Sequence, residues 1–471
     1  MVIGTIAEGV ARSVEGAVAS VSEALFEPVI RLGVTGLSRA GKTVFITALV
    51  ANLMNRARMP QLQAAAQGRI LAAYLQPQPD NTVPRFDYEA HLAAVTGPTP
   101  HWPDSTRAVS ELRLSLKVQP AGLLAGLTGP RTVHLDIIDY PGEWLLDLAL
   151  LDKSYADWAQ ATLARIAPRA EAAAFLAAAG AADPSAPLEE PQAQALAAGF
   201  TAYLQAARAA GYSDCTPGRF LLPGELAGSP ALTFAPLPRP EAARRGALWR
   251  EMERRYEAYR REVVRPFFRN HFARIDRQVV LVDALGAIHA GPPAVEDLRR
   301  SMAEILAAFR PGRSSWLAEL LGAKRVERIL FAATKADHLH HSQHARLTAI
   351  MQEMLRAARD RADFAGAKTA AMAIASLRAT VEATLSRDGE SLDCVKGVLL
   401  ASGKTAAMYP GELPEDPAAL LVPARQGAPR WLNADFAVMG FAPARLSLKP
   451  GEGPPHIRLD RAAEFLLGDR L

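Results

Sequence analysis

A glycine-rich segment near the start of the chain carries the most specific chemical signal. Residues 36–43 read Gly-Leu-Ser-Arg-Ala-Gly-Lys-Thr and match G-x-x-x-x-G-K-[ST] at every position. Glycines let such a loop curl so that successive backbone N–H groups face phosphate oxygens, and the start of the next helix adds a positive field. Lys42 is expected to reach the β- and γ-phosphates, and the Thr43 hydroxyl to ligate Mg²⁺. The expected nucleotide contacts are Gly36, Ser38, Arg39, Ala40, Gly41, Lys42, Thr43 and Val44.

A second Gly-Lys-Thr triplet, at residues 403–405, is predicted to be an ordinary turn. The phosphate-loop pattern requires a glycine five residues before Gly403, and Val398 stands there instead. We therefore assign no phosphate chemistry to this triplet.

Another motif linked to phosphate lies farther along the chain, where residues 139–142 read Asp-Tyr-Pro-Gly and fit D-x-x-G. Asp139 is expected to hold Mg²⁺ through a water, and the Gly142 N–H to contact the γ-phosphate. A plain β-turn is the alternative, because Asp, Pro and Gly all favour turns. Glu143 follows where many GTPases carry a water-orienting glutamine, and a carboxylate there repels the γ-phosphate. We expect slow hydrolysis, and the effect of Glu143 on it stays open.

The first switch of a GTPase closes a threonine hydroxyl over Mg²⁺ and the γ-phosphate. That threonine should lie in the loop before a strand predicted over 110–118. Thr106 is the best placed, and we predict it as a Mg²⁺ ligand and a catalytic group. Ser105 and Thr99 are alternative ligands. A further alternative is that the Thr106 hydroxyl is simply solvated and binds nothing.

A base-reading motif is predicted at residues 334–337, which read Thr-Lys-Ala-Asp and resemble N-K-x-D. Asp337 is expected to accept hydrogen bonds from the guanine N1–H and N2 amino group, which adenine does not offer in that arrangement. The Lys335 stem would lie over the base. Thr334 replaces the usual asparagine, and its hydroxyl is expected to tie this loop to the phosphate-binding loop. A charged helix start with Asp337 near its N-cap is the alternative.

Ser376 and Leu377 stand where GTPases often carry S-A-K, so the Ser376 backbone is expected to support the base oxygen. This signal is weak alone. Together, the phosphate loop, the switch loop, D-x-x-G, an apolar strand, the Thr-Lys-Ala-Asp motif and this segment occur in the order expected of a G domain. That order favours one guanine-nucleotide site with GTP or GDP and Mg²⁺.

The elements that must position these residues follow an α/β pattern. Alternating strands and helices predict a mainly parallel sheet, and the Ala-rich residues 149–275 predict an inserted α-helical domain. Residues 76–106 are expected to be mostly loop, with 110–118 a half-exposed strand beside a buried one at 132–140. Further strands are predicted at 31–38, 277–285, 328–335, 369–376 and 395–401, and helices at 7–30, 42–58, 294–309, 341–361 and 461–468. The predicted domains are an N-terminal amphipathic helix (1–30), a G domain in two parts (31–148 and 276–400), the helical insert (149–275) and a C-terminal extension packing on the G domain (401–471).

The bulk composition narrows the class of protein. The 471 residues carry a formal net charge of +4 from 53 basic and 49 acidic side chains, which does not predict nucleic-acid binding. Cys215 and Cys394 are too few and too distant for a disulfide framework. The polar face predicted for 7–30 is acidic, which argues against membrane attachment. We expect a cytoplasmic protein, with peripheral contact to the inner membrane left open.

The extended motifs resemble those of the YcjX-like bacterial P-loop NTPases. The resemblance rests on GLSRAGKT, IIDYPGEWL, VVLVDALG, ATKADH and the C-terminal HIRLDRAAEFLLGDRL, and it runs from about residue 30 to the end. It implies a Ras-like G domain with a helical domain inserted after D-x-x-G, guanine-nucleotide binding and a link to bacterial envelope stress.

Three functional hypotheses remain open at this stage. The leading one is a regulatory GTPase in which the insert, reached through Trp144, changes orientation or partner affinity with the nucleotide. A static core role for Trp144 is the alternative. The second is an ATPase or nucleotide kinase, which Thr334 keeps open, and the third is a nucleotide-dependent scaffold acting on an unknown protein effector through the insert.

Overall fold

The computed structural model describes residues 27–36, 40–104, 108–121, 129–242, 244–271, 274–308, 326–364, 367–387, 389–431 and 436–471. Most of the helix predicted over 7–30 lies outside these residues. Its last two residues are not helical, because strand β1 begins at Val29. Within the described residues, no helix combines the length and the apolar character that crossing a membrane requires.

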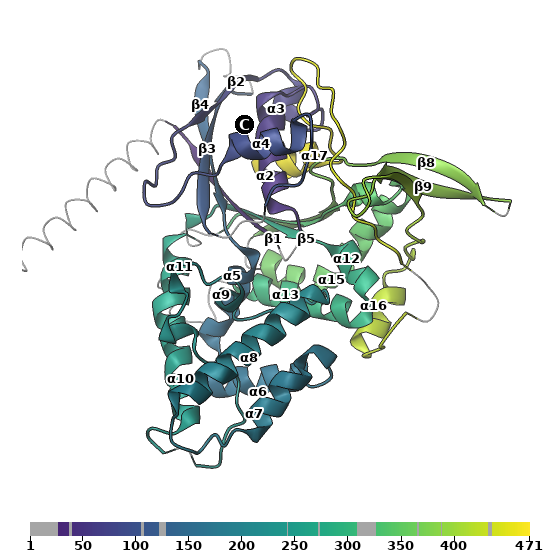
Figure 1. Cartoon of the computed structure of the whole chain (residues 1–471). Helices are drawn as coiled ribbons and strands as arrows, with labels where there is room; N and C mark the ends of the chain where they lie inside the picture. Colours follow the sequence, from purple (N-terminus) through teal and green to yellow (C-terminus); the bar gives the residue numbers. More distant parts are fainter. Residues whose placement is uncertain are drawn as a thin grey trace, which may run out of the picture.

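A seven-stranded sheet forms the centre of the molecule, in the order β2-β3-β4-β1-β5-β6-β7 (Figure 1). β4, β1, β5, β6 and β7 run parallel, whereas β3 is antiparallel to both β4 and β2. The predicted fold class, α/β with a mainly parallel sheet, is therefore confirmed. The strands are β1 (Val29–Gly36), β2 (Ile70–Gln76), β3 (Ser110–Val118), β4 (Arg131–Asp139), β5 (Arg277–Val282), β6 (Arg328–Ala333) and β7 (Lys368–Ala373).

Apolar side chains cover both faces of this sheet. Along β5, Val279 and Leu281 belong to one hydrophobic core, and Val280 and Val282 to the other, as the two-residue period of a strand requires. The first core includes α2 (Lys42–Met54) and α17 (Leu459–Leu467), with α3 (Gln63–Ala66) and α4 (Tyr88–Thr96) nearby (Figure 1). The second includes α12 (Ala284–Ala290), α13 (Pro292–Ala308) and α15 (His344–Phe364).

Strand β3 was predicted to be half-exposed, and the burial of its polar residues shows that this prediction was wrong. Arg113 and Ser115 are buried like their apolar neighbours. The Arg113 guanidinium donates to both carboxylate oxygens of Asp136 on β4, at 2.6 and 2.9 Å, and the Ser115 hydroxyl lies 2.8 Å from the imidazole of His134. The described part of residues 76–106 is mostly loop, as predicted, and it also holds α4 behind an Asp87 N-cap.

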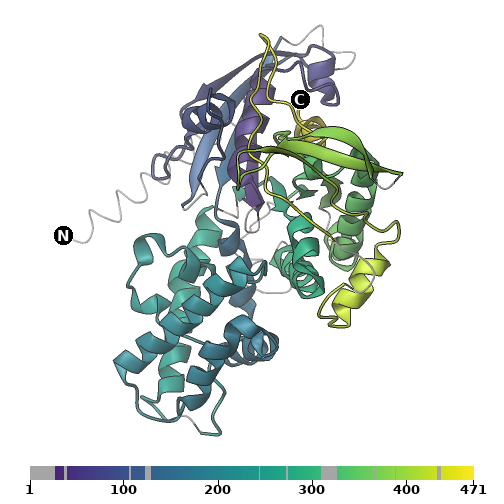
Figure 2. The same cartoon turned by 45° about the vertical axis from the view of Figure 1, so that its right-hand side comes forward.

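Between β4 and β5, the named elements of the described residues are all helical, and they form a lobe beside the sheet (Figure 2). Aromatic rings from three other segments of the lobe pack around Trp158 of α6, namely Phe200, Phe234 and Tyr256. The α-helices are α5 (Gly142–Leu146), α6 (Tyr155–Ile166), α7 (Ala173–Ala181), α8 (Glu190–Ala209), α9 (Gly218–Leu221), α10 (Leu248–Tyr259) and α11 (Arg265–Asn270). Short 3₁₀ helices at Asp147–Asp152, Ala170–Ala172, Gly224–Leu226 and Pro230–Leu232 and a π-helix at Arg260–Val264 complete it.

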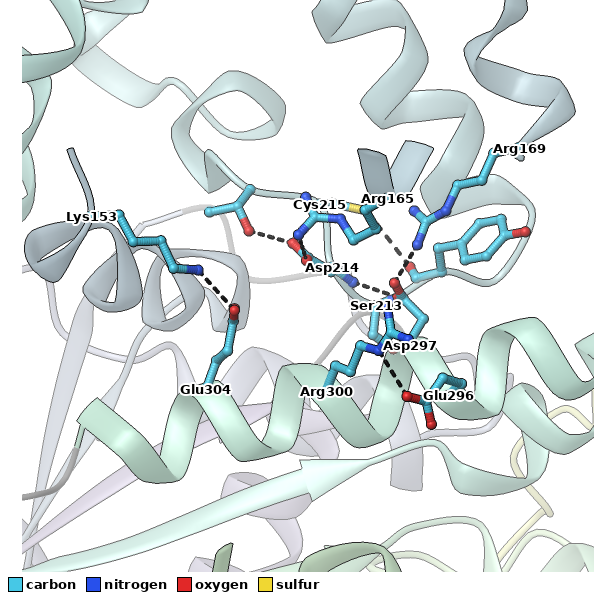
Figure 3. Close-up of polar contacts among 12 residues, drawn as sticks. Lys153, Arg165, Arg169, Ser213, Asp214, Cys215, Glu296, Asp297, Arg300 and Glu304 are labelled. Atoms are coloured by element: carbon cyan, nitrogen blue, oxygen red, sulfur yellow. Dashed lines mark hydrogen bonds and ion pairs between the residues drawn. The ribbon is translucent and has the colours of Figure 1, made fainter. Parts of the chain in front are cut away.

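The lobe is fastened to the sheet region through Asp297 of α13 (Figure 3). The Asp297 carboxylate accepts hydrogen bonds from the backbone amides of Ser213 and Asp214 at 2.6 and 2.8 Å, and it also receives the Arg169 guanidinium. Arg165 pairs with the Asp214 carboxylate at 2.5 Å. We call this cluster the α13 anchor.

The C-terminal region contains a separate antiparallel sheet of β8 (Val381–Arg387), β9 (Glu390–Val398) and β10 (Thr405–Met408). The predicted strand over 395–401 is thus the end of β9, and the predicted boundary at residue 400 falls inside this sheet. The triplet at 403–405 lies at the β9–β10 turn, with Gly403 at a φ of 65°. Helix α16 (Ala418–Arg425) precedes the return of the chain to the main sheet at α17.

Candidate nucleotide-binding site

A cavity of about 490 Å³ opens where several strands of the main sheet end. Its walls come from the loop between β1 and α2, the loops after β6 and β7, Glu143, Arg208 of α8, and parts of the C-terminal region. Ligand pockets of roughly 300–1,000 Å³ hold molecules of nucleotide size. The cavity thus brings together segments that are far apart in the sequence.

The phosphate-loop pattern has the local geometry that its glycines predict. Gly41 is the N-cap of α2 with a φ of 77°, a conformation that side chains disfavour. A Cβ on Gly36 would come within 2.8 Å of the Lys42 side chain. Among the predicted contacts, Gly36, Ala40, Gly41, Lys42, Thr43 and Val44 line the cavity, and Ser38 and Arg39 lie outside the described residues.

Lys42 connects this loop to the D-x-x-G segment. Its ammonium group donates to the Tyr140 carbonyl at 2.6 Å and lies 3.5 Å from the Asp139 carboxylate. Asp139 is buried at the end of β4, beside Val34 of β1 in the parallel register. Asp139 and Gly142 are not among the described residues that line the cavity, and Gly142 opens α5 just behind its wall. Thr106 lies outside the described residues.

The predicted base-reading residues belong to the same cavity. Thr334, Lys335, Asp337, Ser376 and Leu377 all line it. The Asp337 carboxylate accepts the Ala379 N–H through Oδ2 at 2.8 Å, which leaves its other oxygen for a ligand. Lys335 has a left-handed φ of 61° and forms an ion pair with Asp283.

Thr334 is bonded to β5 among the described residues. Its hydroxyl donates to the Val282 carbonyl of β5 at 3.3 Å, and its amide donates to the same oxygen at 2.9 Å. The hydroxyl thus ties the loop to β5 rather than to the described part of the phosphate loop.

Aromatic groups that sequence reasoning missed close the wall near the base-reading end. The Trp102 indole donates to the Phe441 carbonyl at 2.7 Å, and the Phe441 ring meets His338 edge-on with centroids 5.2 Å apart. Burial lowers the pKa of His338, which favours its neutral form. The other cavity residues that sequence reasoning missed are Pro103, Asp104, Arg208, Ala375, Leu400 and Gly440.

Beyond α5, Arg208 is the one described residue of the helical lobe that lines the cavity. Arg208, in the last turn of α8, pairs with the Glu143 carboxylate at 3.2 Å, and both side chains line the cavity. The negative charge of Glu143 is therefore compensated by the Arg208 guanidinium. A basic residue at a helix C-terminus is common, so nothing in the sequence distinguished Arg208 from other surface arginines.

The segment behind Glu143 is bonded to the lobe. The Asp147 carboxylate accepts the Gly218 N–H at 2.8 Å and the Tyr259 hydroxyl at 2.5 Å. A Cβ on Gly218 would lie only 2.3 Å from the Glu143 carbonyl oxygen, so α9 packs directly on α5. Trp144 is buried between the Arg219 guanidinium, 3.2 Å above its ring, and the edge of Phe267. We call these contacts the switch contact.

Comparisons with known proteins find relatives over nearly the whole chain. A model of the YcjX-like family, DUF463, matches residues 30–471. The chain is 38% identical over 458 residues to the Ras-like GTPase YcjX of Escherichia coli (strain K12), covering 94% of this chain and 96% of that protein. It is 37% identical over 469 residues to the Ras-like GTPase YcjX of Shewanella oneidensis (strain MR-1), covering 94% of each.

Proposed function

The chain belongs to the YcjX-like family, and we propose that it is a regulatory protein that binds GTP and Mg²⁺ and hydrolyses GTP slowly. The observation that supports this most is the shared cavity. All described residues of the phosphate loop, together with Glu143 and Asp337, line one cavity. Phosphates at Lys42 and a guanine at Asp337 would use both ends of it.

The oxygen donors suit Mg²⁺, a hard cation that prefers carboxylate, hydroxyl and phosphate oxygens. Thr43 and Asp139 are the described residues that would hold it, and Lys42 already lies 3.5 Å from Asp139. Thr106 remains the predicted ligand from the first switch. When bound, Mg²⁺ supplies positive charge to the β- and γ-phosphate oxygens.

Arg208 supplies a second positive charge from within the chain. Glu143 follows directly on the predicted γ-phosphate contact Gly142, so its partner Arg208 stands at the phosphate end of the cavity. An arginine at this position stabilises the negative charge that builds up on the transferred phosphoryl group. While Glu143 holds the guanidinium, that charge is withheld, which is a physical reason for slow hydrolysis.

The biological setting is part of the proposal. Family resemblance supports a role in bacterial envelope stress, in the cytoplasm, with contact to the inner membrane left open. The helical lobe is the proposed surface for an effector protein. The alternative is a nucleotide-dependent scaffold or ATPase acting through the same lobe. Thr334 supports this alternative, because it stands where the guanine-binding motif N-K-x-D has asparagine.

Nucleotide preference tests the proposal. Calorimetry with GTP, GDP and ATP should show a preference for guanine of roughly a hundredfold or better, because adenine leaves the Asp337 carboxylate unpaired. Asp337→Asn should lower GTP affinity and raise affinity for xanthosine triphosphate, whose base carries an acceptor where guanine carries an amino group. Lys42→Ala should abolish binding of all of these nucleotides, and the variant should stay folded. Equal affinities of the unaltered chain for GTP and ATP would refute the guanine assignment.

A further inference from the structure

Three side chains with metal-ligating atoms converge outside the nucleotide cavity. His340 and His341 follow the base-reading loop, and Glu382 lies on β8. Their ligand atoms all lie within 4.8 Å of one another. The site joins a loop of the main sheet to the separate C-terminal sheet.

The spacing of these atoms fits a small coordination sphere. His341 Nδ1 lies 2.9 Å from Glu382 Oε2, and His340 Nε2 lies 3.7 Å from the same oxygen. Two ligands at the usual zinc distances of 2.0–2.1 Å stand about 3.3–3.4 Å apart in a tetrahedron. The observed separations lie on either side of that value, so small side-chain rotations would complete the geometry.

The surroundings orient each donor toward the same point. His340 Nδ1 lies 3.3 Å from the Asp393 carboxylate of β9 and 2.9 Å from the Ser342 hydroxyl, which leaves Nε2 facing Glu382. A histidine that binds a metal commonly donates its other ring N–H to a carboxylate in this way. The other Glu382 oxygen, Oε1, accepts the His341 amide at 3.1 Å and lies 3.8 Å from Arg378. Glu382 Oε2 is thereby directed at both imidazoles.

We propose that His340, His341 and Glu382 bind one divalent transition-metal ion of the zinc class, with Asp393 orienting His340. Two imidazoles and one carboxylate form a donor set that suits such ions better than Mg²⁺. The partial exposure of Glu382 and the wide exposure of His341 leave a further coordination position open to solvent. The bound ion links the loop after Asp337 to β8, and the Ala379 N–H, two residues before β8, donates to the Asp337 carboxylate.

Titration of the tag-free, nucleotide-free full chain with Co²⁺, followed by its visible absorption and by displacement with Zn²⁺, tests this site. We expect one equivalent of Co²⁺ to bind with the bands of a low-coordinate ion. His341→Gln and Glu382→Gln should each weaken binding at least about tenfold, and Asp393→Asn about 10–100-fold. The side chain of His341 is 69% exposed, so its replacement leaves the fold intact.

His289→Gln is the matched control, because His289 is an exposed histidine on α12, outside this cluster. It should bind Co²⁺ as the unaltered chain does. Absence of one-equivalent binding would overturn the proposal, and so would affinities in His341→Gln and Glu382→Gln equal to that of the unaltered chain. Nucleotide binding does not enter this readout, so the result is independent of the proposed GTPase activity.

Discussion

The helical lobe meets the rest of the molecule at two places that differ in their chemistry. At the α13 anchor, the Arg169 and Asp297 side chains are 7% and 3% exposed, and Asp297 also caps two backbone amides. At the cavity, Arg208 and Glu143 are 29% and 10% exposed and form one ion pair at 3.2 Å. Removing one partner of a buried, bonded pair costs several kcal/mol, whereas an exposed pair contributes little. The difference indicates that the anchor holds the lobe more firmly than the cavity pair does.

Behind the cavity pair, the switch contact links the two regions covalently and by hydrogen bonds. Asp147 lies in the chain directly after α5 and holds Gly218 at the start of α9. A displacement of residues 139–143 on hydrolysis would therefore act first on α9 and Arg208. Four experiments separate the anchor from the switch contact.

The largest expected effect is on stability, at the anchor. Asp297→Ala leaves the Arg169 guanidinium and the Ser213 and Asp214 amides without their partner, and it should lower the free energy of unfolding by about 3–5 kcal/mol. Glu304→Ala, on the same helix, removes a pair with Lys153 in which both side chains are about one-third exposed. That control should cost less than about 1 kcal/mol. Equal losses in urea denaturation would contradict the anchor.

The second effect is a pH dependence at the switch contact. Burial raises the pKa of Asp147 to about 7, from 3.8. At a pH between these two pKa values, Asp147 is protonated in the folded chain and ionised in the unfolded chain. The free energy of unfolding therefore falls as the pH rises from about 4 to 7. Asp147→Asn removes this contribution and should flatten the profile by roughly 2–4 kcal/mol. Parallel unfolding profiles of the two chains between pH 4 and 8 would count against a buried, protonated Asp147.

The third effect concerns catalysis rather than stability. Arg208→Ala should slow single-turnover GTP hydrolysis at least about a hundredfold, because it removes a charge that stabilises the transferred phosphoryl group. The same change should lower the free energy of unfolding by less than Asp297→Ala does, because Arg208 is more exposed than Asp297. Arg208→Lys keeps the positive charge but loses the planar guanidinium. Its rate of GTP hydrolysis should lie between those of the unaltered chain and Arg208→Ala. Unchanged hydrolysis in Arg208→Ala would leave the cavity pair a structural contact only.

The same contrast explains what the sequence predicted well. The phosphate loop, D-x-x-G and the Thr-Lys-Ala-Asp motif are contiguous, so their chemistry is legible in the residues themselves, and the order of strands and helices indicated the mainly parallel sheet. Most of the predicted contacts that fall within the described residues line one cavity. Their roles in binding and catalysis remain predictions.

The rest depends on contacts between distant segments. Arg208, Trp102 and Phe441 reach the cavity from three separate regions, and no local pattern marks them. The predicted exposure of β3 was wrong because its polar side chains have buried partners on β4. The alternation of apolar and polar residues in the sequence does not reveal such partners. The short β2 and α4 were missed because the Pro- and Thr-rich sequence around them favours loops.

Hydrogen exchange at two nearby sets of amides tests the central claim, that the nucleotide acts on the lobe through the switch contact while the anchor stays closed. The Ser213 and Asp214 amides donate to Asp297, and the Gly218 amide donates to Asp147. Between GDP and a non-hydrolysable GTP analogue, protection of Gly218 and of α9 should change, and protection of Ser213 and Asp214 should not. Identical protection in both states across residues 149–275 would contradict the claim and leave the lobe a passive appendage.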